Sequence, residues 1–340
     1  MAGLLEIDKL RVSYRTMRGE ARAVDGVSLS IAPGEYLGLV GESGCGKSTI
    51  AKAILGILPG NGRVSAGAIR FNGADLVGMT AAQLRAMRWR HIALVPQSAM
   101  NGFDPVYTVE RQLDEAIRAH DAMPAEARLQ RIKEMFAMVG LEKARLGDYP
   151  HQFSGGMRQR AMIAMAMVLD PDLVVADEPT TGLDVIVQDQ IMQRIRAIHE
   201  RQNKTMLLIT HDMAVVAENC DKIAVMYAGR LVESGGKEVF GRPFHPYTLG
   251  LCNAFPDLDD RGRELISIAG APPDLVDPPT GCRFAARCPF AADRCRIEEP
   301  QLREAAPGQL VACHFTNRAE EFRLRARDAD TWRHARATEA

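Results

Sequence analysis

The sequence has no apolar run long enough to cross a lipid bilayer, since none approaches the ~20 consecutive apolar residues that a membrane-spanning helix needs. Its first residues also lack the basic segment followed by an apolar segment that marks a secretory signal. We therefore expect the chain itself to stay in the cytosol.

Net charge is nearly absent as well. Lysine and arginine number 42 against 43 aspartates and glutamates, which gives a formal charge of −1. This balance provides no electrostatic reason to expect nucleic acid as a partner. The hydrophobic content of 46% is ordinary for a soluble globular protein, and 340 residues suggest one large domain or two smaller ones.

The closely paired cysteines of a zinc ribbon are missing. Four of the seven cysteines instead crowd into one segment, at Cys282, Cys288, Cys295 and Cys313. In a reducing compartment such crowding suggests metal before disulfides. Four thiolates in an irregular, proline-rich segment suit a [4Fe–4S] cluster, which accepts varied spacings. Zinc, with His314 able to replace one ligand, and free structural thiols remain the alternatives.

What the sequence does contain is a glycine-rich loop that matches the phosphate-binding pattern G-x-x-x-x-G-K-[ST] at every fixed position. The loop reads Gly41-Glu42-Ser43-Gly44-Cys45-Gly46-Lys47-Ser48-Thr49. Its glycines let successive N–H groups point at phosphate oxygens. Lys47 brings a positive charge to the β- and γ-phosphates, and the Ser48 hydroxyl can bind Mg²⁺. The loop therefore predicts binding of a nucleoside triphosphate.

The residues around this loop support that interpretation. A buried strand is expected over residues 36–40 and an apolar helix over 48–58, whose N-terminus favours an anion. Upstream, alternating apolar residues predict strands of an antiparallel sheet near 10–14 and 27–31. Tyr14 lies on the first of these strands, where its ring could stack on an adenine face or pack as an ordinary strand tyrosine.

A second anion site is predicted at Ser154-Gly155-Gly156. These residues precede an apolar helix expected over residues 161–169, so they would supply exposed N–H groups and a hydroxyl at a helix N-terminus. A helical pattern between about 107 and 149 separates this site from the first loop. On spacing, the two sites need not serve the same phosphate.

Polar residues also end three predicted strands. The strands are expected over residues 91–95, 173–177 and 206–209. Gln97 follows the first and is placed for Mg²⁺ or water. Asp177 ends the second and could hold Mg²⁺ through water, while Glu178 could polarise an attacking water as general base. His211 follows the third and could orient that water at the γ-phosphate.

Taken in order, these motifs resemble those of the ATP-binding subunits of ABC transporters, over roughly residues 4–241. The resemblance makes Tyr14 the residue that stacks on adenine and residues 41–49 the Walker A loop. It makes Gln97 the Q-loop glutamine and Asp177 the end of the Walker B strand. Both would hold Mg²⁺ with the Walker A serine.

The same resemblance gives roles to the later motifs. Glu178 becomes the catalytic glutamate and His211 the switch histidine, with Lys47 carrying charge during hydrolysis. Ser154-Gly155-Gly156 becomes the family signature, and Asp184 lies in the D-loop.

In this family, two ATPase domains meet head to tail, and the signature of each covers the ATP held by the Walker A loop of the other. ATP then closes the pair and hydrolysis reopens it. Met157 and Phe153 depart from the common form of the signature but leave its serine and glycines unchanged. The resemblance therefore implies a working composite site.

The signature and the tail after residue 241 narrow the resemblance to the dipeptide/oligopeptide-importer branch, and within it to the first of two paired ATPase subunits. This implies an α/β P-loop ATPase over residues 1–241, with an antiparallel β subdomain and a helical subdomain over about 98–168. A small irregular extension over residues 242–340 would carry the cysteines, for which this branch favours the [4Fe–4S] cluster.

The expected partners follow from the same branch. They are a second ATPase subunit, either a paralogue or a copy, two transmembrane permease subunits and an extracytoplasmic solute-binding protein. The chain would then be peripheral at the cytoplasmic face of the inner membrane, powering uptake of di- or oligopeptides or a related solute. The alternative is a soluble ABC ATPase not coupled to transport. A single phosphate loop and the lack of sustained heptads disfavour it.

Overall fold

The computed structural model describes residues 3–97, 102–254 and 268–333. The chain folds into two compact units, each built from separate segments. The first unit comprises residues 31–36 and 78–209 with the N-terminal residues up to Leu4. The second unit comprises residues 5–30, 37–77 and those from Thr210 onward.

The first unit contains a sheet of parallel, buried strands. These are β6 (Ile92–Val95), β7 (Leu173–Asp177) and β8 (Thr205–Thr210), with β7 in the centre. Every residue of β7 and β8 is buried, as expected where helices cover both faces of a parallel sheet. The three strands predicted from apolar runs are confirmed.

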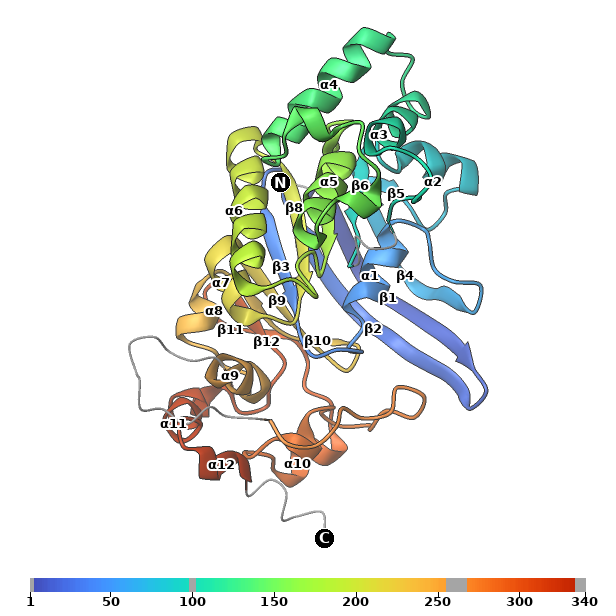
Figure 1. Ribbon diagram of the computed structural model, residues 1–340. Coiled ribbons are helices and arrows are strands. Elements are labelled where there is room, and N and C mark those ends of the chain that lie inside the picture. Colours follow the sequence, from blue (N-terminus) through green and yellow to red (C-terminus); the bar gives the residue numbers. More distant parts are fainter. Residues whose placement is uncertain (1–2, 98–101, 255–267, 334–340) are drawn as a thin grey trace. The chain divides into compact units, whose positions relative to one another are not determined.

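Helices make up most of the remaining first unit (Figure 1). They are α2 (Ala81–Met87), α3 (Val109–Arg118), α4 (Ala125–Met138), α5 (Gly155–Met167) and α6 (Val185–Gln202). Helix α5 packs against α3, α4, α6 and β6. The helix was predicted to begin at residue 161, but it begins at Gly155, where the Ser154 hydroxyl caps its first turn.

The second unit begins with the antiparallel sheet that the alternating apolar residues predict. Its strands are β1 (Leu5–Thr16), β2 (Gly19–Ile31), β4 (Gly62–Phe71) and β5 (Ala74–Asp75), in the order β2-β1-β4-β5. Leu10 and Val12 are fully buried on one side of β1. The predicted alternation of apolar and polar residues therefore matches a sheet that buries one face and exposes the other.

The phosphate loop follows a strand of the second unit's other set of paired strands. Strand β3 (Tyr36–Val40) runs parallel to β9 (Lys222–Tyr227), which forms an antiparallel hairpin with β10 (Arg230–Gly235). Helix α1 (Lys47–Ile54) leaves the loop and ends earlier than predicted. Gly56 has a φ of +62°, and the N–H of Ile57 donates to the carbonyl of Lys52 at 2.9 Å, which closes the helix.

The tail is more regular than its sequence predicts. Strands β11 (Arg303–Ala306) and β12 (Gln309–Val311) extend the hairpin, since β12 pairs with β10. Such short strands leave no detectable period in the sequence and form because β10 offers an edge to pair with. The α-helices of the second unit after β8 are α7 (Met213–Asn219) and α8 (Glu238–Gly241), which precede the tail, and α9 (Pro246–Asn253), α10 (Asp293–Ile297), α11 (Ala319–Arg325) and α12 (Ala329–Arg333) within it.

Aromatic rings form the core of this tail. Tyr227, Tyr247 and Phe284 are each buried, with ring centroids 4.7–5.3 Å apart. Phe290 stacks on Phe322 at 4.2 Å. The predicted domain boundaries stay predictions, and the expected start of the helical subdomain at residue 98 lies outside the described residues. Within the described ranges, no helix is both long and apolar enough to cross a membrane.

Candidate nucleotide site and cysteine pocket

The glycines of the phosphate loop are needed because its backbone is crowded and turns in the left-handed region. Gly46, directly before α1, has a φ of +108°, and a Cβ there would lie 2.2 Å from the carbonyl oxygen of Ala23. A Cβ on Gly41 would lie 2.1 Å from the carbonyl oxygen of Met226. No other residue type fits either position without moving backbone.

Lys47 is buried within this loop. Its Nζ donates hydrogen bonds to the carbonyls of Gly41, at 2.6 Å, and Glu42, at 3.0 Å. Helix α1 begins at Lys47, and Gly46 caps it without a side chain. Its first N–H groups therefore face the loop together with the ammonium, which is an arrangement suited to phosphate.

The predicted adenine-stacking tyrosine is held beside α1. The Tyr14 hydroxyl and the Thr49 hydroxyl lie 3.2 Å apart and share a hydrogen bond. Thr49 is the last residue of the loop motif and lies in the first turn of α1. This bond therefore joins β1 to the helix that leaves the phosphate loop. The structure thus brings Tyr14 and the loop together, and the stacking role stays a prediction.

Two residues of the tail that the sequence did not single out, Tyr247 and Arg287, contact Glu42, the second residue of the loop. The N–H of Glu42 donates to the Tyr247 hydroxyl at 2.8 Å. Its carboxylate accepts from Arg287 Nη1, also at 2.8 Å. Glu42 occupies a variable position of the loop pattern, and its two partners lie in the tail. No local sequence signal could have found them.

The predicted acidic pair lies in the first unit at the end of β7. Asp177 is buried, and Glu178 follows it with a φ of +47°, in the left-handed region that few residues other than glycine adopt. The N–H of Glu178 donates to the carbonyl of Ile209 at 2.7 Å, which fixes this turn. Backbone of this kind concentrates at functional sites.

The structure brings Gln97 and Glu178 together. Gln97 Nε2 donates to Glu178 Oε2 at 2.8 Å, and the Thr181 hydroxyl donates to the same oxygen at 3.0 Å. The glutamine predicted to serve Mg²⁺ or water therefore orients the predicted base directly. Thr181 was not singled out in that role by the sequence.

The signature serine and the D-loop aspartate are both helix caps. Ser154 Oγ accepts from the N–H of Met157 at 3.3 Å, and Asp184 Oδ1 accepts from the N–H of Val187 at 3.0 Å. A Cβ on Gly156 would lie 2.4 Å from Val187 Cγ1. The signature glycine therefore allows α5 to approach α6 closely. The predicted helix N-terminus is present at Ser154-Gly155-Gly156, and its role as an anion site stays a prediction.

His211 lies in the second unit between β8 and α7, where its side chain is exposed. The following residue, Asp212, caps α7 by accepting from the N–H groups of Ala214 and Val215. The histidine is thus fixed at the end of a strand, as predicted.

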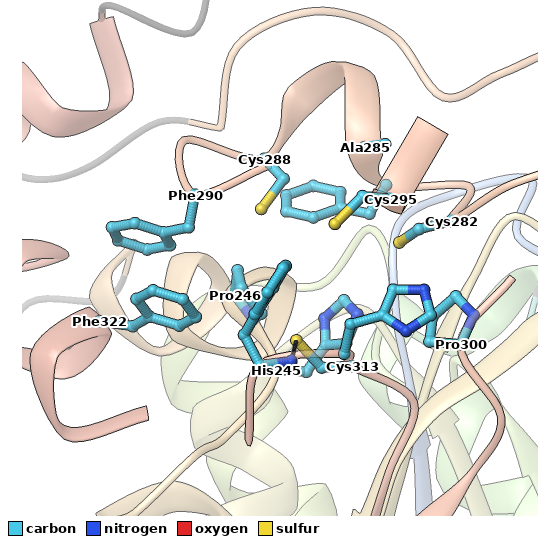
Figure 2. A pocket seen from close by; sticks show the side chains of 13 residues that line it. His245, Pro246, Cys282, Ala285, Cys288, Phe290, Cys295, Pro300, Cys313 and Phe322 are labelled. Atoms are coloured by element: carbon cyan, nitrogen blue, oxygen red, sulfur yellow. Dashed lines mark hydrogen bonds between the residues drawn. The ribbon is translucent and has the colours of Figure 1, made fainter. Parts of the chain in front are cut away.

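Four cysteines of the tail line one pocket of the second unit, and they are Cys282, Cys288, Cys295 and Cys313. Figure 2 shows the sulfur atoms of the first three on one side of this pocket and that of Cys313 facing them. Burial raises the pKa of the Cys282 thiol to about 12 and that of Cys313 to about 11. Burial also raises the pKa of the Cys288 thiol well above its usual value. A metal would have to displace the protons of these thiols.

No group of three or more histidine, cysteine, aspartate or glutamate side chains in the described part of the chain is arranged to hold a metal ion. The arrangement of these side chains therefore does not support the predicted [4Fe–4S] cluster, and it does not support a zinc site. It does show that the four cysteines share one pocket.

Two family descriptions match the chain. The description "ABC transporter" matches residues 24–181. The description "Oligopeptide/dipeptide transporter, C-terminal region" matches residues 232–295. With the α/β fold and the phosphate loop, the first match defines the class of protein, an ABC ATPase.

Relatives match over nearly the whole chain. The dipeptide transport ATP-binding protein DppD of Bacillus subtilis is 42% identical over 97% of this chain and 99% of its own length. The oligopeptide transport ATP-binding protein OppD of Salmonella typhimurium is 44% identical over 91% of this chain and 93% of its own. The chain therefore belongs to the ATP-binding subunits of ABC transporters, in the branch that carries this C-terminal region. As a member of that family it hydrolyses ATP to drive transport.

Solved structures agree on the fold. The ATP-binding cassette MJ0796, described as a dimeric post-hydrolysis state bound to ADP and Pi, is similar with a TM-score of 0.62 and 26% identity. The similarity covers 68% of this chain and 98% of that one. The predicted α/β ABC ATPase fold is confirmed.

Proposed function

We propose that this chain powers the uptake of dipeptides and oligopeptides through partner permeases. The observation that carries the proposal is that relatives named for dipeptide and oligopeptide transport match it over nearly its full length, including the C-terminal region. A soluble ABC ATPase not coupled to transport is not favoured, because these relatives are transport proteins by name.

In this function, Lys47 and the N–H groups of the phosphate loop bind the ATP phosphates. The buried ammonium and the open N-terminus of α1 support the assignment. We assign Mg²⁺ to Ser48, Gln97 and Asp177, whose hydroxyl, amide and carboxylate oxygens are the hard ligands that this ion takes. When bound, the ion neutralises charge on the phosphates.

We assign the general base to Glu178. Two donors, Gln97 and Thr181, bond to the same carboxylate oxygen and orient the carboxylate. The other oxygen is then available to take a proton from water. His211 orients the γ-phosphate in this scheme. A base held by hydrogen bonds keeps its geometry without reorganisation during the reaction.

We infer that Ser154-Gly155-Gly156 binds the ATP of a partner subunit. The support is the capped N-terminus of α5, which presents N–H groups and a positive dipole end. Asp184 caps the neighbouring α6 and would lie at the same dimer contact. The partner is a second ATPase of this family, and together they would act on two permease subunits at the cytoplasmic face of the inner membrane. A solute-binding protein outside would deliver the peptide.

We further infer that the four cysteines that line this pocket hold one [4Fe–4S] cluster. The support is that all four line one pocket (Figure 2). Such a cluster gives each thiolate its own iron, so its ligands need not crowd around a point as those of a single ion must. Its role would be structural, because no step of ATP hydrolysis needs a redox centre.

Transport is tested by deleting the gene in its own host and measuring uptake of radiolabelled dipeptides and tripeptides. We expect the wild-type gene to restore uptake and Lys47→Ala not to restore it, at equal protein levels. Lys52→Ala, on the same helix, removes an exposed lysine and serves as the matched control. Unchanged peptide uptake in the deletion strain would refute the peptide proposal. That result would not affect the assignment of the ATP site, which is tested separately by measuring ATP hydrolysis.

A further inference from the structure

We propose that Tyr247 and Arg287, two residues of the C-terminal region, are positioning residues for the phosphate loop and determine how tightly it binds ATP. Both act through Glu42, the second residue of the loop. The proposal relies on ATP binding by this loop and is independent of the transported solute.

Tyr247 fixes the backbone of the loop. Its hydroxyl accepts the hydrogen bond of the Glu42 N–H at 2.8 Å. The ring is fully buried and packs against Tyr227 and Phe284, with centroids 4.7 and 5.3 Å away. Because the ring cannot move in this cluster, the hydroxyl has a fixed position and sets the plane of the Gly41–Glu42 peptide.

Arg287 fixes the side chain of the same residue. Its Nη1 donates to Glu42 Oε2 at 2.8 Å and to the Tyr227 hydroxyl at 3.1 Å, and only 7% of the arginine side chain is exposed. Although burial opposes the charge, hydrogen bonds to Glu42 and Tyr227 raise the pKa of this guanidinium. The guanidinium therefore keeps its charge although it is buried beside the Glu42 carboxylate.

The other two nitrogens of Arg287 also donate hydrogen bonds. Nε donates to the carbonyl of Ala269 at 2.8 Å, and Nη2 donates to that of Ile268 at 3.2 Å. A planar guanidinium can satisfy all of these acceptors at once, whereas a lysine ammonium at the end of a flexible chain cannot. The geometry requires arginine at this position.

Lys47 completes the set of contacts around Glu42. Its Nζ donates to the carbonyl of Glu42 at 3.0 Å and to that of Gly41 at 2.6 Å. The N–H, the carbonyl and the carboxylate of Glu42 are thus all bonded, two of them to the C-terminal region and one to the ammonium that binds phosphate. A shift of Glu42 therefore shifts Lys47, and small misplacements of a phosphate-binding group weaken its interactions steeply.

A buried arginine of the same segment provides a control. Arg283 is as buried as Arg287, but it bonds to Asp25 of β2 and to the carbonyl of Ala228. It stabilises the attachment of the segment without touching Glu42. An effect specific to positioning must therefore differ between the two arginines, while an effect of general unfolding must not.

The experiment measures binding of ATP to the full-length chain by equilibrium titration, with thermal melting as a check on folding. The variants are Tyr247→Phe, Glu42→Gln, Arg287→Met, Arg287→Lys and Arg283→Met. Tyr247→Phe removes one hydroxyl and keeps the packed ring, so it tests the proposal even if the arginine variants fail to fold. Loss of one such hydrogen bond corresponds to about a tenfold weaker Kd.

We expect Tyr247→Phe and Arg287→Met each to weaken ATP binding about tenfold, and Arg287→Lys to recover little. Combining Arg287→Met with Glu42→Gln should add little to either change alone, because both remove the same contact. Arg283→Met should leave the Kd within about twofold. Wild-type affinity in Tyr247→Phe, or an equal loss in Arg283→Met and Arg287→Met, would overturn the proposal.

Discussion

At single residues, two positions of the candidate site have backbone conformations that few residues adopt. Glu178 has a φ of +47° directly after β7, and Gly46 has a φ of +108° directly before α1. Such conformations cost free energy and persist only where the surrounding structure fixes them. At Glu178 the fixing bond is the N–H to the carbonyl of Ile209. Substitution at each position therefore tests the site directly.

Glu178→Gln should keep ATP binding and slow hydrolysis by between about a hundredfold and ten-thousandfold, because an amide cannot take a proton from water. Its oxygen can still accept the bonds from Gln97 and Thr181. Phosphate release at saturating ATP measures the rate, and light scattering should show a long-lived ATP-bound dimer. Glu200→Gln, exposed on α6, is the control. Hydrolysis at the wild-type rate by the first variant would exclude Glu178 as the base.

Gly46→Ala should abolish tight ATP binding. The added Cβ would lie 2.2 Å from the carbonyl oxygen of Ala23, in a backbone conformation that alanine rarely adopts. Strain of this kind costs about 1–3 kcal/mol, and relief requires the loop to move away from its phosphate-binding geometry. ATP titration and chemical denaturation together measure both effects.

The matched control is Gly60→Ala, because a Cβ there meets nothing within 4 Å and the residue has no positive φ. Its ATP affinity should equal that of the wild type. If Gly46→Ala bound ATP equally well, the loop would not need the observed backbone.

At the level of elements, helix α9 is a part of the fold whose attachment should depend on pH. His245 is 1% exposed, and its Nδ1 accepts from the N–H of Tyr247 at the start of the helix. The buried carboxylate of Glu233 accepts from the N–H groups of Phe244 and His245, at 2.8 and 2.9 Å. Burial lowers the pKa of His245 to about 3, and burial raises that of Glu233.

The sign of the histidine effect follows from proton counts. An unfolded chain takes up a proton at His245 below pH ~6.5, while the folded chain does so only near its folded pKa of about 3. Between these values the unfolded state binds more protons, so stability is lost as the pH falls. From neutral pH to about pH 5 the free energy of unfolding should drop by about 2 kcal/mol from this group.

His245→Asn isolates this contribution, because asparagine also caps helix N-termini well but does not titrate. Denaturant unfolding of the metal-free chain at both pH values should show a smaller loss in the variant by about that amount. The raised pKa of Glu233 acts in the opposite direction, but it is common to both proteins and cancels in the difference. Equal losses in the two proteins would mean that the histidine is not buried in its neutral form.

At the level of the whole molecule, the proposed cluster in the cysteine pocket predicts a metal content. The chain purified without air should contain about four irons and four sulfides, with a broad absorption band near ~400 nm. Removal of the iron by a chelator should lower the melting temperature, because metal-binding free energy contributes to folding. Cys288→Ala should lose the band.

Cys220→Ala is the matched control for this measurement. Cys220 is fully buried but does not line the pocket, so its variant should keep the iron. Zinc in place of iron would make the pocket a structural zinc site. The absence of any metal from anaerobically purified protein would return the four cysteines to ordinary thiols.

Sequence patterns predicted many of the helices and strands but misplaced the ends of several of them. Apolar runs located β6, β7 and β8, because a buried parallel strand needs a continuous apolar segment. The start of α5 was missed because its first turn begins with two glycines and the apolar run starts only at Ala161. Strands β11 and β12 were missed because they are too short to show a period.

The sequence by itself determined the phosphate loop, the acidic pair and the signature. Each of these motifs works through a few adjacent residues whose backbone and charge are set locally, so their types and spacing are visible in one dimension. Only the tertiary structure decided what holds the loop in place. The partners of Glu42 lie 205 and 245 positions along the chain, at Tyr247 and Arg287. Contacts at such separation depend on how strands and rings pack, and no local pattern encodes them.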